Sequence, residues 1–437
     1  MAAVNLFWLV ACGSSVPSGP ALTAWFGDPH VHTGASGDGC SSDMGVEPGE
    51  LCGAVATIGQ DAAAEGLSWF TLADHLNGPH ARTDTAAGAD WRALIDAGVA
   101  TEEVLVLAGG EAYVSTPDGD LGHYTVIFFA DALPGLTRDL ASPSGSAEGT
   151  VASCDALRTW VDGLSAWGPS LVVPHHPASL RPMAVDWSCL PAGAPVVEVY
   201  SHWGNGLAWQ SAAEPHADYD PLGTEPDETV VESTVVSAMA AHPEFALGFV
   251  AGTDGHRTGP GKVCDEHAGG RYGGGLTGAL LPEGVALTRA ALFDAFQARH
   301  TYATTGPRVA LHVDVIVGDS VVGTLGDQLS LPGKTEVLLR LQLADALTWE
   351  SDVASVSAIQ PGVTLPEQVR TTAAAVGGGR YEATIVVDPD TAPTYAYFEV
   401  VLAGAQAHPA DCVDEATSVF SDDTERVWTS PTWFSRS

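Results

Sequence analysis

The chain has 437 residues and a formal net charge of −37, from 17 basic and 54 acidic side chains. A field of that sign repels nucleic-acid backbones and anionic membranes, so we expect no binding of nucleic acid duplexes. A small anionic substrate stays compatible with this charge, because bound cations reverse the field inside a pocket.

Residues 1–21 are expected to be an export leader followed by a tether. The apolar run LFWLVA is shorter than the roughly 20 residues that span a bilayer. It ends in LVAC, which resembles a bacterial lipobox with Cys12 as the acylated residue, and Ser, Gly and Pro follow. No Lys or Arg precedes the run, and a buried apolar N-terminus is the alternative. We favour an exported protein, periplasmic or extracellular, with a membrane tether through lipidated Cys12.

Residues 22–306 alternate apolar, strand-like runs with helix-like stretches. The strand-like runs are LTAWFG, SWFTLA, VLVLAGG, YTVIFF, SLVVP, PVVEVYS and FALGFVAG. Helical periodicity appears in 53–66, 151–166, 229–242 and 288–299. Continuous apolar strands separated by helices are typical of a mainly parallel sheet buried on both faces. Seven such runs predict an α/β domain with a closed or nearly closed barrel.

Residues 307–437 have a different pattern. Runs such as TEVLLRLQLAD and RYEATIVVD alternate in polarity, turns rich in Gly, Pro and Asp separate them, and no long helical period is visible. This pattern predicts a small antiparallel β domain at the C-terminus.

Polar side chains cluster where the predicted strands of the first domain end. In parallel barrels the carboxyl ends of the strands meet at one mouth, so groups that follow different strands come together there. His123 is the exception, because it precedes its run. The groups that follow a run are Asp28, His30, His32, Asp74, His75, Glu111, His175, His176, His202, Asp254 and His256.

The spacing of these groups favours a metal site. Residues i and i+2 of a strand face the same way, so His30 and His32 can bind one ion together. Asp74 and His75 point apart if extended, which makes one a ligand and the other its supporting partner. Imidazoles with a few carboxylates suit Zn, Mn or Fe better than Ca or Mg. A single HxH pair is most often incidental, but burying so many polar groups without ions or partners is costly.

Cysteine usage agrees with export. Without Cys12 the number of cysteines is even, which suits disulfides, but the sequence does not choose the pairing. Cys40 and Cys52 are the closest pair in the chain, and no CxxC spacing indicates a thiolate zinc site. The remaining cysteines are Cys154, Cys189, Cys264 and Cys412.

The motif series resembles a known superfamily. The order DPHVHTGASGD, LADH, GGE, GHYTV, PHHP and GTDGH resembles the PHP (polymerase and histidinol phosphatase) superfamily. Within it, FGDPHVHT, PHHPAS, EVYSHWG, GGLTGALLPEGVALTRAALFDAFQARHTYATTGPRV and WTSPTWF resemble the DUF3604 family, whose activity is not well defined. The resemblance implies a distorted (β/α)7 TIM-like barrel that binds two or three divalent ions.

The resemblance also implies which residues bind each ion. Glu111 would bridge the first and second ions, and Asp38 is the least secure ligand because relatives often carry His there. His176 is favoured over His175 because it directly precedes Pro, although the doublet leaves both open. The implied sets are His30, His32, Glu111 and Asp254; Glu111, His123 and His176; and Asp38, His75 and His256.

We therefore expect a metal-dependent hydrolase, with a phosphate ester as the favoured substrate. A water between two ions has its pKa lowered toward neutrality and can attack as hydroxide. His202 or Asp74 could protonate the leaving alcohol, and Arg257 could clamp a phosphate. One alternative keeps the metals but cleaves an amide or carboxylic ester. Another is a cell-surface binding protein in which the metals are only structural. Oligomeric state is not predicted.

Overall fold

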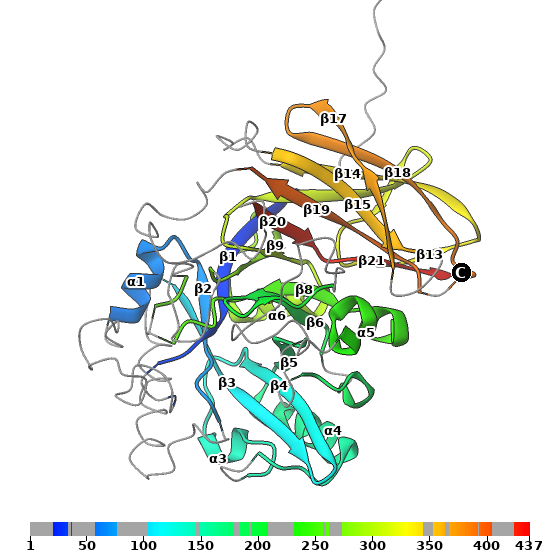
Figure 1. Ribbon diagram of the computed structural model, residues 1–437. Helices are drawn as coiled ribbons and strands as arrows, with labels where there is room; N and C mark the ends of the chain where they lie inside the picture. The colour runs from blue at the N-terminus through cyan, green and yellow to red at the C-terminus, as the bar shows by residue number, and fades with distance from the viewer. Residues whose placement is uncertain are drawn as a thin grey trace, which may run out of the picture.

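The computed structural model is a mixed α/β structure, made mostly of sheet with few helices (Figure 1). The residues that it describes are 21–33, 36, 57–76, 104–145, 149–178, 184–191, 194–208, 231–256, 259–261, 273–343, 353–362, 367–391, 393–403 and 424–437. Among these, no helix is long and apolar enough to cross a membrane.

The N-terminal part is built on one large sheet and one small sheet. In the large sheet, β1, β2 and β3 are parallel, whereas β4 runs antiparallel between β3 and β5, and β9 runs antiparallel to β1. In the small sheet β6 and β8 are parallel. The strands are β1 (Leu22–Val31), β2 (Trp69–Leu72), β3 (Leu105–Thr116), β4 (Gly119–Phe128), β5 (Ser170–His175), β6 (Val196–Ser201), β7 (Gly204–Asn205), β8 (Gly248–Ala251), β9 (Leu276–Pro282) and β10 (Thr301–Thr304).

Four helices lie within the stretches in which helical periodicity was expected. Three of them begin at a side-chain cap, for example α4, where Ser153 accepts a hydrogen bond from the Ala156 amide. These helices are α1 (Ile58–Ala64), α4 (Cys154–Leu164), α5 (Val235–Ala241) and α6 (Arg289–Gln297), and a short α3 (Arg138–Ala141) lies outside the expected stretches. Single 3₁₀ turns form η3 (Ser165–Trp167), η4 (Trp187–Cys189), η7 (Val231–Ser233) and η8 (Pro243–Phe245).

The expected closed (β/α)7 TIM-like barrel is not shown. Across the described residues the strands form an open sheet, in the order β13-β21-β19-β20-β10-β9-β1-β2-β3-β4-β5, and β7-β6-β8 form a separate sheet. The reason lies at the β3–β4 connection, which is a tight hairpin between Thr116 and Gly119. No helix crosses there, so β4 returns antiparallel where a barrel of parallel strands needs a crossover.

The C-terminal region is rich in sheet, as expected. A five-stranded sheet has the order β12-β11-β14-β18-β17, and the remaining strands extend the large sheet through the pairing of β20 with β10. The boundary near residue 307 stays a prediction, because β10 and β20 are neighbours in one sheet. The strands are β11 (Leu311–Val317), β12 (Ser320–Gly323), β13 (Gln328–Leu331), β14 (Thr335–Leu343), β15 (Val353–Pro361), β16 (Gln368–Thr372), β17 (Ala374–Gly377), β18 (Arg380–Val387), β19 (Tyr395–Leu402), β20 (Glu425–Thr429) and β21 (Thr432–Arg436).

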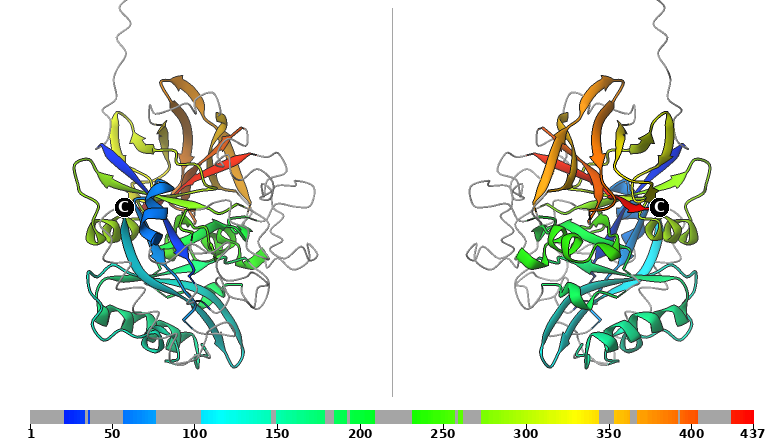
Figure 2. Two further views of the ribbon diagram at one scale, coloured as in Figure 1. Left: turned by 90° about the vertical axis from the view of Figure 1, so that its left-hand side faces the viewer. Right: turned by 90° about the vertical axis from the view of Figure 1, so that its right-hand side faces the viewer.

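The C-terminal strands lie at one end of the molecule and the β3–β4 hairpin at the other (Figure 2). Trp428 and Trp433 of the C-terminal region belong to the same buried apolar cluster as Leu247, Phe249 and Ala251 of the N-terminal part. The Trp433 indole donates to the Leu247 carbonyl at 3.1 Å. The two regions therefore share a core that supports the strands carrying the site.

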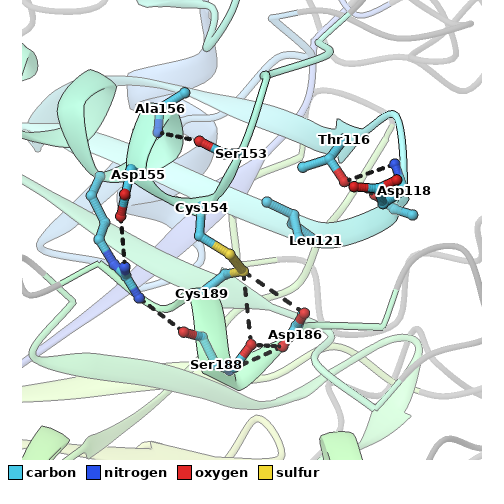
Figure 3. Close-up of a disulfide and its surroundings, with 12 residues drawn as sticks. Thr116, Asp118, Leu121, Ser153, Cys154, Asp155, Ala156, Asp186, Ser188 and Cys189 are labelled. Atoms are coloured by element: carbon cyan, nitrogen blue, oxygen red, sulfur yellow. Dashed lines mark hydrogen bonds and ion pairs between the residues drawn. A yellow bond between two sulfur atoms is a disulfide. The ribbon is translucent and has the colours of Figure 1, made fainter.

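One disulfide lies among the described residues and joins Cys154 at the start of α4 to Cys189 in η4 (Figure 3). Asp186 and Ser188 flank it, with the Cys189 sulfur 3.8 Å from the Asp186 Oδ2. Disulfides are typical of oxidising compartments, in keeping with export, which stays a prediction. Cys12, Cys40, Cys52, Cys264 and Cys412 lie outside the described residues.

Candidate metal centre

Strand β1 brings two imidazoles to one point. Asp28 and His30 lie on β1, and His32 directly follows its last residue, so the three occupy alternate positions along the chain. The His30 Nδ1 lies 2.7 Å from the Thr125 hydroxyl, and the His32 Nδ1 lies 2.9 Å from the Ser36 hydroxyl. These hydroxyl contacts at Nδ1 orient both rings so that their Nε2 atoms face each other, 2.9 Å apart.

Strands β3, β4 and β5 supply a second set from one face of an antiparallel ladder. Tyr113 of β3 lies opposite His123 of β4, which lies opposite His175 of β5. Glu111 lies two residues before Tyr113 on the same face, and its Oε1 contacts the His123 Nδ1. His176 follows β5 with a φ of 28°, and its Nε2 lies 3.9 Å from the Glu111 Oε1.

The turn after β8 supplies the carboxylate that faces these imidazoles. Asp254 adopts a φ of 55°, and its amide donates to the His30 carbonyl at 3.0 Å. Its Oδ1 lies 3.0 Å from the His32 Nε2, and its Oδ2 lies 3.2 Å from the His175 Nε2. Left-handed backbone at non-glycine residues is concentrated at functional sites, and here both Asp254 and His176 have it.

Together these side chains form four overlapping groups whose ligand atoms lie within 4.8 Å of one another. Glu111 belongs to two groups, and so do Asp254 and His256. All members are buried. The groups are His30, Glu111, His175 and Asp254; Glu111, His123 and His176; His32, His75 and His256; and His202, Asp254 and His256.

The donor set fits divalent cations. Two imidazole Nε2 atoms and two carboxylate oxygens face one another, with the Glu111 Oε2 3.3 Å from the His30 Nε2 and 3.2 Å from the His32 Nε2. Such spacings suit ligands around one ion bound at about 2.0–2.2 Å. The His176 Nδ1 is buried and has no hydrogen-bond partner among the described residues. These groups could therefore hold metal ions.

The titration behaviour of the first two imidazoles reflects this crowding. Burial lowers the pKa of His32, but hydrogen bonds and charge from Asp254 and Glu111 outweigh it and raise the pKa to about 10. Burial and the nearby His175 lower the pKa of His30 to about 3. At His32 the two carboxylates thus stabilise positive charge, whereas at His30 burial and His175 outweigh them.

Two buried aspartates accept hydrogen bonds from backbone amides next to the four ligand groups. Asp28 accepts hydrogen bonds from the Thr253 amide at 3.0 Å, the Thr253 hydroxyl at 2.5 Å and the Gly261 amide at 3.0 Å. It thereby ties β1 to the turn that carries Asp254. Asp74 accepts from the Thr33 amide at 2.6 Å and from the Thr33 hydroxyl at 2.9 Å, directly after His32.

His202 lies inside the cluster, with its Nε2 3.6 Å from the Asp254 Oδ2. Burial lowers its pKa to about 3 despite the Asp254 charge, so the ring is neutral near pH 7. A neutral imidazole at this place suits a ligand or a proton acceptor better than a proton donor. Asp38 and Arg257 lie outside the described residues.

Sequence reasoning missed two residues that contact the groups. Glu198 of β6 is buried, its Oε2 lies 2.8 Å from the His175 Nδ1, and its Oε1 accepts from the His176 amide at 3.1 Å. Its signal was an acid in the middle of the apolar run PVVEVYS. Trp203, which follows β6, donates its indole N–H to the Asp254 Oδ2. No sequence signal marked that contact.

The described members of the predicted ligand sets lie together, and His175 is added to them. The His32 Nε2 lies 2.9 Å from the His30 Nε2 and 3.0 Å from the Asp254 Oδ1, as the expected first set requires, and His32 also lies with His75 and His256. His175 joins His30, Glu111 and Asp254. The doublet therefore contributes both rings, His175 to one group and His176 to another. The group of Glu111, His123 and His176 coincides with the expected second set.

One family model matches a part of the chain. Residues 271–319 match the family model "Protein of unknown function (DUF3604)". The matched stretch contains β9, α6, β10 and β11, and the family model states no activity. The PHP superfamily stays a resemblance of motifs.

Curated relatives are uncharacterized proteins of Chlamydia. The chain is 27% identical over 170 residues to one from Chlamydia pneumoniae, which is 39% of this chain and 25% of that protein. It is 25% identical over 170 residues to one from Chlamydia muridarum, again 39% and 25%. The match thus spans about a quarter of the length of these relatives.

A solved amidohydrolase from Chromobacterium violaceum, with bound sulfate and no metal, is a weak structural neighbour. The identity is 16% and the TM-score 0.27, over 52% of this chain and 87% of that one. A score this low supports no shared fold.

Proposed function

We propose that this chain is a metal-dependent hydrolase of the PHP type that acts on phosphate esters. The observation that carries the proposal is the sharing of Glu111 and Asp254 between adjacent buried groups of imidazoles. A carboxylate that belongs to two groups can hold two cations close together, which a single structural ion does not require. The motif resemblance supports a phosphate ester as the substrate.

In this proposal the chain divides its ligands among adjacent cations. His30, His175, Glu111 and Asp254 would hold one ion, and His123 and His176 a second one shared through Glu111. His32, His75 and His256 would hold a third. Imidazole nitrogens with carboxylates suit Zn, Mn or Fe. Such ions supply a Lewis acid and a water of lowered pKa.

Residues next to the ligands orient the ligand side chains. Thr125 and Ser36 hold the His30 and His32 rings so that both Nε2 atoms point inward. Asp28 keeps the Asp254 turn against β1. Because the ligand side chains are almost fully buried, the protein excludes bulk water from most of the cluster, and this strengthens electrostatic interactions there.

The test uses the full chain purified with its metals. We expect at least two ions per chain by elemental analysis, and turnover of 4-nitrophenyl phosphate or bis(4-nitrophenyl) phosphate with Mn or Zn. Glu111→Gln is expected to lower kcat/KM by about a hundredfold or more, since it loses the charge shared by two ions. The matched control is Glu382→Gln on β18, whose carboxylate pairs with Arg340 at 2.8 Å.

Three outcomes would contradict the proposal. One is fewer than about two ions per chain. Another is turnover of 4-nitrophenyl acetate or an anilide with no turnover of either phosphate. The third is a chain that turns over nothing and unfolds when chelated, because structural metals hold the fold itself.

A further inference from the structure

Two aromatic rings flank the group of Glu111, His123 and His176. The Tyr113 ring packs edge-to-face on His123, with centroids 5.0 Å apart and an interplanar angle of 76°. The Trp203 ring meets His176 at 6.1 Å and 69°. His123 and His176 are themselves 4.7 Å apart, so the order in space is Tyr113, His123, His176, Trp203.

These two rings are the accessible neighbours of a buried cluster. Tyr113 and Trp203 are both partly exposed, whereas His123 and His176 are 8% and 5% exposed. Within the cluster, the His123 side chain is 10% exposed and those of His32 and His175 are 0% exposed. Solvent thus reaches the cluster beside Tyr113, and to a similar extent at His75 and His256, whose side chains are 8% and 7% exposed.

The polar atoms of both rings are already used inside the protein. The Tyr113 hydroxyl donates to Asp120, and the Trp203 indole N–H donates to Asp254. What these side chains offer a ligand is therefore ring surface. Flat apolar surface next to a charged site suits a ligand with a charged head and a flat apolar body.

We propose that Tyr113 and Trp203 select the non-reacting part of the substrate: an apolar ring, carried on the alcohol side of the phosphate ester. This inference rests on the proposed phosphoesterase function and narrows its substrate class. The phosphoryl group lies at the imidazole and carboxylate cluster, and the ring of the alcohol packs against Tyr113 or Trp203. Esters of small alkyl alcohols lack this contact.

The experiment measures binding, so that it does not depend on turnover. Phenylphosphonate and methylphosphonate are titrated calorimetrically into the metal-loaded full chain. Wild-type protein is expected to bind phenylphosphonate about tenfold more tightly. Tyr113→Leu and Trp203→Leu should each reduce this preference, taken as the ratio of the two affinities, about fivefold, the size of one aromatic contact.

Conservative variants separate ring contact from structural roles. Tyr113→Phe and Trp203→Phe keep a ring but lose the bonds to Asp120 and Asp254, and both should retain the preference for phenylphosphonate. Tyr381→Leu, a partly buried tyrosine of β18, is the matched control for loss of an aromatic ring elsewhere. Thermal melts establish that each variant is folded.

Equal affinity of wild-type protein for the two phosphonates would overturn this inference and leave the phosphoesterase proposal standing. An equal loss of affinity for both phosphonates in the leucine variants would also overturn it, since the two rings would then only support the structure of the cluster. If neither phosphonate bound the metal-loaded chain, the phosphoesterase proposal itself would fail.

Discussion

Replacement of Glu198 by glutamine tests whether the cluster depends on its supporting carboxylate. Glu198 is 2% exposed and holds both histidines of the doublet, the His175 ring at 2.8 Å and the His176 amide at 3.1 Å. With its carboxylate accepting from the Nδ1, the His175 Nε2 carries a lone pair toward Asp254. That orientation is the one a metal ligand needs.

A glutamine side chain has one oxygen, so it cannot accept hydrogen bonds from both the His175 Nδ1 and the His176 amide through separate oxygens as Glu198 does. If its oxygen accepts from the His176 amide, its NH₂ group faces the His175 Nδ1 and favours the tautomer with the proton on Nε2. That proton then points at the Asp254 Oδ2, 3.2 Å away, in place of the lone pair. If the amide is turned over, two N–H donors meet near His176. Either arrangement should weaken metal binding by about 10- to 100-fold, or about 1.4–2.7 kcal/mol.

The assay is a titration of metal-free protein with Zn²⁺ or Mn²⁺ against a chromophoric chelator. Glu382→Gln, on a different sheet, is the control for loss of one carboxylate charge. Near-UV circular dichroism shows whether the variant keeps its packing. A folded Glu198→Gln protein that binds metal within twofold of wild type would refute the reasoning, because the orientation of His175 would then contribute nothing.

Two further predictions concern stability. Cys154→Ser combined with Cys189→Ser opens a link between residues 35 apart, and loop-closure entropy predicts a loss of about 4 kcal/mol in the free energy of unfolding. Denaturant unfolding measures it, and a change below about 1 kcal/mol would contradict the entropic estimate. Burial raises the pKa of Glu399, but Arg370 and Arg426 outweigh it and hold the pKa below its usual value. This stabilisation is present above the unfolded pKa of about 4.5 and is lost as the pH falls below it, so wild-type stability should fall more steeply on acidification than that of Glu399→Gln. Parallel pH profiles of the two proteins would show that the pairing is not coupled to stability.

The identity of the cluster residues followed from local rules. His30 and His32 share a face because side chains alternate along a strand, and this is decided by residues two positions apart. The placement of His75, Glu111 and Asp254 after apolar runs followed from the same reasoning. Glu111 lies in one group with Asp254, and its Oε2 is 3.5 Å from the His75 Nδ1. The four expected helices also lie where the periodicity placed them, since helical period and caps are local signals.

The direction of the strands and the contacts between distant side chains were decided only by the tertiary structure. The sequence did not reveal that YTVIFF returns antiparallel in a hairpin, so a closed barrel was expected where the sheet is open. His175 and His176 could not be told apart, because the positive φ of His176 sends the two rings to different groups. Glu198 and the Cys154–Cys189 pair are likewise matters of which distant segments touch. Periodicity depends on residues that are close in the sequence, whereas strand direction and side-chain partners depend on the packing of segments far apart in the chain.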